Sequence, residues 1–105
     1  HRTFWRLDMP LYTLIAHDRK NGLEQRMAHR PAHLEHMARL DAVGRIQYGG
    51  PLLDDKGDMV GSLIIIEADD LESARATYAE DPYVIHGVFG DYDVVGTKQV
   101  FPRGN

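Results

Sequence analysis

The chain has 105 residues, with 12 Lys and Arg against 16 Asp and Glu, six His and no Cys. This length suits one domain, and the longest apolar run, residues 63–66, is far shorter than the roughly 20 residues of a membrane-spanning helix. The absence of Cys excludes disulfides, thiolate metal sites and Cys nucleophiles. The formal net charge of −4 gives no electrostatic support for nucleic acid as a partner. We therefore expect a cytoplasmic protein that binds neither nucleic acid nor membrane.

The first residues differ from the rest of the chain. Residues 1–8 mix basic and aromatic side chains without periodicity, and Met9 follows them directly. We interpret residues 1–8 as an N-terminal extension or a remnant of cloning, and residues 9–105 as a single domain.

Four short segments have the length and apolar content of β-strands. They lie at residues 11–16, 45–49, 62–67 and 91–98. The third contains an unbroken Leu-Ile-Ile-Ile run, which indicates a central strand that is covered on both faces. Asp and Gly residues between positions 51 and 61 predict the turn that joins the second and third strands.

Two longer segments have helical patterns. Apolar residues recur at three- and four-residue steps between residues 23 and 41, and Gly44 follows where a left-handed cap is expected. Asp69 with Glu72 three residues later predicts a capping box that opens a second helix over residues 70–80.

The element order βαββαβ predicts an α+β, ferredoxin-like fold, with a four-stranded antiparallel sheet and two main helices on one of its faces. Both alternating sets of side chains on the first strand are largely apolar, so the second face of the sheet also needs cover. We therefore predict a homodimer that packs sheet to sheet. The two sets are Leu11, Thr13 and Ile15, and Tyr12, Leu14 and Ala16.

A helical wheel separates the histidines of the first helix. With Leu34 at the centre of the apolar stripe, His33 lies at its rim, about 100° away, and Arg30 lies inside it. His29 and His36 fall on the solvent side. Because the three histidines do not converge, the pattern argues against a metal site, and we expect no metal. The stripe comprises Leu23, Met27, Leu34, Met37, Ala38 and Asp41, with Arg26 at its edge.

Two residues have ordinary structural interpretations when each is taken alone. His33 is typical of a histidine at the boundary of a buried face. Asp81 precedes Pro82 and is typical of the N-cap of a short helical turn, which Gly87 would close.

Several short motifs, in this order and spacing, resemble the YciI-like (YCII-related) family over residues 11–101. The resemblance implies a ferredoxin-like fold that forms dimers of the dimeric α+β barrel type. It also implies an active site with one His and one Asp, which correspond here to His33 and Asp81. Some relatives act on muconolactone-type substrates, as a chloromuconolactone dehalogenase does. The motifs are Arg30-Pro31-Ala32-His33-Leu34, Gly50-Pro51-Leu52, Gly61-Ser62, Leu71-Glu72-Ser73-Ala74, Asp81-Pro82-Tyr83 and Gly87-Val88.

On this basis we expect a cofactor-independent lyase, isomerase or dehalogenase that acts on a small anionic organic molecule. His33 would be the general acid and base, and Asp81 would orient it. Arg30 would need an anionic partner, either a substrate carboxylate or an internal Asp. The alternative is a non-catalytic dimeric module that binds a small molecule. The residues expected to line the pocket beside Arg30 are Gly50, Pro51 and Ser62.

Overall fold

The computed structural model describes residues 9–103, so the interpretation of residues 1–8 lies outside the described part of the chain. The four strands are β1 (Leu11–Asp18), β2 (Ile46–Leu53), β3 (Met59–Glu67) and β4 (Phe89–Thr97). The helices are α1 (Leu23–Ala42), α2 (Leu71–Ala79) and α3 (Pro82–Ile85). Within the described residues, no helix is both long and apolar enough to cross a membrane.

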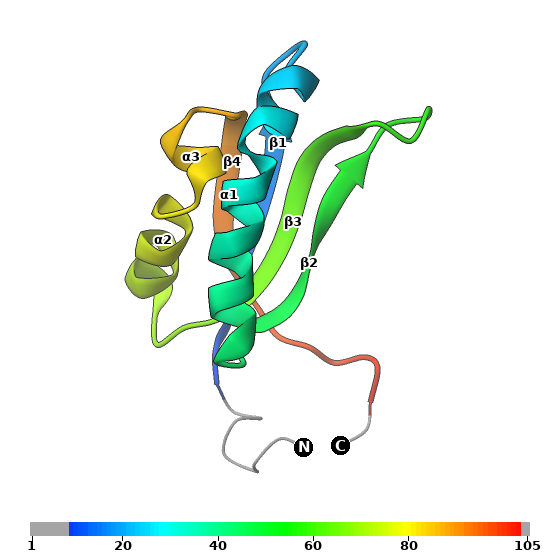
Figure 1. Ribbon diagram of the computed structural model, residues 1–105. Helices are drawn as coiled ribbons and strands as arrows, with labels where there is room; N and C mark the ends of the chain where they lie inside the picture. Colours follow the sequence, from blue (N-terminus) through cyan, green and yellow to red (C-terminus); the bar gives the residue numbers. More distant parts are fainter. Residues whose placement is uncertain (1–8, 104–105) are drawn as a thin grey trace.

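The strands form one antiparallel sheet in the order β2-β3-β1-β4, and all helices lie on the same side of it (Figure 1). This arrangement confirms the predicted α+β, ferredoxin-like fold. Leu14, Ile64 and Val94 are directly opposite one another on β1, β3 and β4, and all three are buried beneath the helices. Because side chains alternate along a strand, their sequence neighbours face the uncovered side.

The β2–β3 hairpin is longer than predicted, and it projects past the helices in Figure 1. The predicted turn over residues 51–61 is therefore too wide. Pro51 is part of β2, which is an edge strand, and edge strands tolerate a residue without a backbone N–H. The tight turn is held by the Asp54 carboxylate, which accepts hydrogen bonds from the backbone N–H groups of Lys56 and Asp58.

Helices α1 and α3 end at the predicted glycines, but the N-cap of α2 lies one residue later than predicted. Asp70, rather than Asp69, is the N-cap of α2, and its carboxylate accepts a hydrogen bond from the backbone N–H of Ser73 at 2.8 Å. The predicted capping box therefore began one residue too early. Gly44 and Gly87 both have positive φ, of 76° and 67°, as expected where helical turns end.

The buried face of α1 is not the one that the apolar pattern predicted. Leu34 and Met27 are 45% and 48% exposed, whereas His36, predicted to face solvent, is 5% exposed. The buried face lies about 110° around the helix from Leu34. The prediction was wrong because polar residues occupy the inner face, so hydrophobicity does not reveal it. The buried residues of α1 are Arg26, His33, His36 and Leu40.

Candidate active site

His33 and Asp81 meet where α3 packs against α1. The Asp81 carboxylate caps α3 by accepting a hydrogen bond from the backbone N–H of Tyr83 at 2.9 Å. Both of its oxygens also lie 2.9 Å from Nδ1 of His33. The same side chain is therefore both a helix cap and the partner of His33. With the carboxylate as acceptor, Nδ1 is the donor and Nε2 is the ring nitrogen left without a protein partner among the described residues.

Tyr83 lies between two side chains of α1. Its ring stacks on the imidazole of His33, with centroids 4.0 Å apart and planes 11° apart. The guanidinium carbon of Arg26 lies 4.6 Å from the centroid of the same ring. Arg26 and His33 are seven residues apart, which places them on one side of α1 about 10 Å apart along its axis, so the ring fits between them. Burial raises the pKa of the Tyr83 phenol, although Arg26 and Arg30 act against this shift.

Arg26 is neutralised by a buried ion pair. Its guanidinium donates to both carboxylate oxygens of Asp18, at 2.9 and 3.1 Å, and to Oγ of Ser62 at 2.7 Å. Burial raises the pKa of Asp18, and the charge of Arg26 opposes that effect. These contacts connect α1 to the end of β1 and to β3, so Arg26 supports the fold as well as the site.

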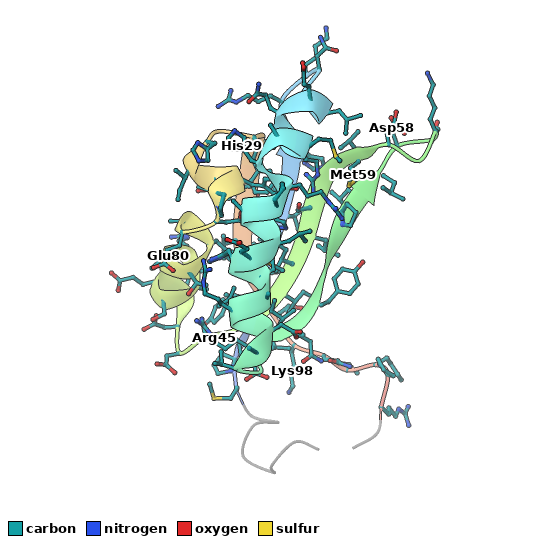
Figure 2. The ribbon with its side chains drawn as sticks, viewed as in Figure 1. His29, Arg45, Asp58, Met59, Glu80 and Lys98 are labelled. Carbon is teal, nitrogen blue, oxygen red and sulfur yellow. The ribbon has the colours of Figure 1, made fainter. Side chains whose placement is uncertain are left out.

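A pocket of about 390 Å³ lies between α1 and the β2–β3 half of the sheet. Met59, one of its lining residues, is on the hairpin side of α1 in Figure 2. Asp81 does not line the pocket and lies behind His33, to which it is bonded. Of the residues expected from the sequence, the pocket brings together Arg30, His33, Gly50, Pro51 and Ser62.

Arg30 differs from Arg26, one helical turn before it. It is half-buried, lines the pocket and makes no hydrogen bond or ion pair within residues 9–103. The sequence left open whether Arg30 meets an internal Asp or a substrate anion. In the structure, the buried carboxylate of Asp18 pairs with Arg26. The positive charge of Arg30 therefore faces the pocket without an ion-pair partner among the described residues.

The other histidines of α1 lie away from the pocket. Burial lowers the pKa of His36, although the nearby Asp81 carboxylate opposes the shift. His29 is half-buried and stacks on His86, with ring centroids 4.1 Å apart, on the α3 side of α1 in Figure 2. Across the part of the chain that is described, no three His, Asp or Glu side chains are grouped as metal ligands.

Sequence reasoning assigned no role to Arg26 or Tyr83. Two signals were present in the chain. The seven-residue spacing of Arg26 and His33 places both on one side of the helix. Tyr83 follows Asp81 by two residues, so a capped turn that brings Asp81 to His33 brings Tyr83 there as well.

The two arginines are expected to differ in their effect on stability. Arg26→Met leaves the Asp18 carboxylate buried without its partner and should lower the free energy of unfolding by about 3 kcal/mol. Arg30→Met removes an unpaired cation and should change it by less than about 0.5 kcal/mol. Urea denaturation of both variants measures this difference, and equal losses would contradict the assignment of the ion pair to Arg26.

Comparisons with known proteins identify the family. The YCII-related domain matches residues 10–98. Protein YciI of Escherichia coli O6:H1 is 38% identical over 97 residues, which cover 87% of this chain and 99% of the relative, and an uncharacterized protein of Haemophilus influenzae is 36% identical over 96 residues, covering 86% and 98%. A solved structure, 5-chloro-2-hydroxyhydroquinone dehydrochlorinase from Burkholderia phenoliruptrix in complex with 2,5-dihydroxybenzoquinone, is 32% identical with a TM-score of 0.75, covering 84% of this chain and 93% of that one. The chain belongs to the YCII-related, YciI-like family.

Proposed function

We propose that the protein is a small, cofactor-independent enzyme that uses His33 and Asp81 for general acid–base chemistry on an anionic organic molecule. The observation that carries the proposal is the bond between Nδ1 of His33 and both oxygens of Asp81, at 2.9 Å each. A carboxylate in this position fixes one imidazole tautomer and stabilises the imidazolium that forms when Nε2 accepts a proton. A placed acid–base group of this kind contributes roughly 10²–10⁴-fold to a rate.

The walls of the pocket support proton transfer to or from an ionised substrate. Arg30 supplies a positive charge that no described side chain neutralises. This charge favours binding of a substrate with an ionised ring oxygen, which is the form that accepts a proton at the adjacent ring carbon. Gly49, Gly50 and Pro51 line the pocket on the β2 side. Gly49 has no side chain on the face towards α1, where a Cβ atom would lie 2.8 Å from the methyl group of Met37.

The dehydrochlorinase relative supports a hydroxylated, halogenated ring as the substrate class. Loss of HCl from such a ring needs only proton transfers. Protonated His33 delivers a proton to the chlorine-bearing ring carbon while an adjacent ring oxyanion becomes a carbonyl. Chloride then leaves with the electron pair of its bond, and a ring hydroxyl gives its proton to the neutral Nε2 of His33, which restores the protonated imidazole. The net change is loss of HCl, with no oxidant or reductant consumed.

Substitution of His33 tests this proposal. His33→Gln combined with Asp81→Asn, which leaves no unpaired carboxylate, should reduce chloride release from 5-chloro-2-hydroxyhydroquinone at least about 100-fold. His36→Gln is the matched control, because His36 is buried on the same helix but does not line the pocket, and it should keep most of the activity. Undiminished chloride release by the double variant would refute the role of His33. Ligand binding by the wild-type protein without turnover would favour a binding module instead.

We also propose that the protein is a homodimer that packs through the uncovered face of the sheet. The register places one row of side chains across all four strands on this face. Within the row, Tyr48 is 50% exposed and Val95 is 47% exposed. Ile15, in the next row, is 39% exposed. Several exposed apolar side chains on one face of a sheet are typical of a protein interface. The row comprises Tyr48, Ile65, Thr13 and Val95.

A charge at the centre of this face should separate the protomers. Light scattering of the wild-type protein at micromolar concentration is expected to give the mass of two 11.9 kDa chains, and Ile15→Lys should shift it towards one chain. Ile85→Lys is the matched control, since Ile85 is exposed on the helical side, and it should leave the mass unchanged. A monomeric wild-type protein would refute the dimer.

A further inference from the structure

The hydroxyl group of Tyr83 has no hydrogen-bond partner within the described residues, although its side chain is completely buried. The other fully enclosed tyrosine behaves differently. The hydroxyl of Tyr78 lies 2.8 and 2.9 Å from the backbone carbonyls of Tyr12 and Ile64. A buried hydroxyl without a partner costs free energy, so its presence calls for an acceptor that residues 9–103 do not supply.

The surroundings of the Tyr83 hydroxyl specify the charge of that acceptor. Arg26 and Arg30 both lie within electrostatic reach of the phenol, and all three residues line the pocket. The nearest carboxylates are already engaged, since Asp18 pairs with Arg26, and Asp81 bonds His33 and the Tyr83 backbone N–H. Nε of Arg26 is also buried without a partner in the described part of the chain. This end of the pocket therefore has positive charge and hydrogen-bond donors without partners. The donors are the Tyr83 hydroxyl, the Arg30 guanidinium and Arg26 Nε.

The opposite end of the pocket has a different character. Asp41 lies eleven residues after Arg30, about 16 Å further along α1. The wall between them is largely apolar, with Leu34 and Met37 on the helix and Ile46 on β2. A ring or halogen of the substrate that extends towards this end would therefore meet apolar side chains.

We propose that the Tyr83 hydroxyl and the Arg30 guanidinium together donate hydrogen bonds to one ionised oxygen of the substrate. The proposal rests on the proposed function and defines its substrate more narrowly. Because burial raises the pKa of this phenol, Tyr83 keeps its proton at neutral pH and acts as a donor. Its ring stacks on His33 at the same time, so the oxygen it holds lies next to the acid–base group.

Tyr83→Phe tests the proposal because it keeps the stacked ring and removes only the hydroxyl. Calorimetry with 2,5-dihydroxybenzoquinone, which is ionised at neutral pH, should show binding weakened about tenfold or more in this variant. Binding of 2,5-dimethoxybenzoquinone, which has the same ring without the charge, should hardly change. Tyr92→Phe is the matched control, because Tyr92 does not line the pocket.

Thermal unfolding distinguishes a ligand-binding hydroxyl from a structural one. Removal of a hydroxyl without a protein partner should leave the melting midpoint of Tyr83→Phe unchanged or higher, whereas Tyr78→Phe, which loses its bonds to the backbone, should melt at a lower temperature. A crystal structure of the wild-type protein with 2,5-dihydroxybenzoquinone gives a check that needs no variant. It should place a quinone oxygen within about 3.2 Å of the Tyr83 hydroxyl.

Tight binding of the ionised quinone by Tyr83→Phe, or a wild-type protein that does not prefer it over the dimethoxy compound, would overturn the proposal. These outcomes are independent of those for the proposed function, because they measure binding alone. Binding that depends on Tyr83 without any turnover would uphold this inference while refuting the enzyme. Turnover that depends on His33 but not on Tyr83 would uphold the proposed enzyme and refute this inference about Tyr83.

Discussion

The packing of polar side chains on the inner face of α1 is the constraint on which the site depends. Buried cations and imidazoles are costly unless each has a hydrogen-bonded partner. Asp18 at the end of β1 supplies one partner, for Arg26, and Asp81 at the start of α3 supplies the other, for His33. The two pairs fix α1 against the sheet and against α3, and they also determine which nitrogen of His33 is left for the pocket.

The same constraint separates two arginines that are neighbours on the helix. Arg26 points to the core, where its charge is cancelled by Asp18. Arg30, one turn later, reaches the pocket without such a partner in the described chain, so its charge is available to a ligand. Tyr83 links the two regions, because its ring contacts Arg26 and His33 while its hydroxyl lies among donors. The structural support and the ligand binding that we propose thus come from adjacent turns of one helix.

Periodicity and turn chemistry predicted the order of the elements, the single sheet and the short turn capped by Asp81. They failed for the orientation of α1, because its buried face carries Arg26 and His36, while Leu34 and Met27 are partly exposed. A hydrophobic stripe marks a buried face only where the core is apolar, and here ion pairs replace apolar contacts. His33, Asp81 and the pocket residues were expected from the family resemblance, whereas the role proposed for Tyr83 depends on a burial that no sequence pattern reports.

The central claim is that Asp81 holds His33 as the Nδ1–H tautomer, with Nε2 open to the pocket. Nitrogen-15 NMR of the histidine side chains measures this directly. The neutral imidazole of His33 should show a protonated Nδ1 and an unprotonated Nε2, and addition of 2,5-dihydroxybenzoquinone should shift the Nε2 signal. A proton on Nε2 of the neutral ring, or an Nε2 signal that does not respond to the quinone, would contradict the account.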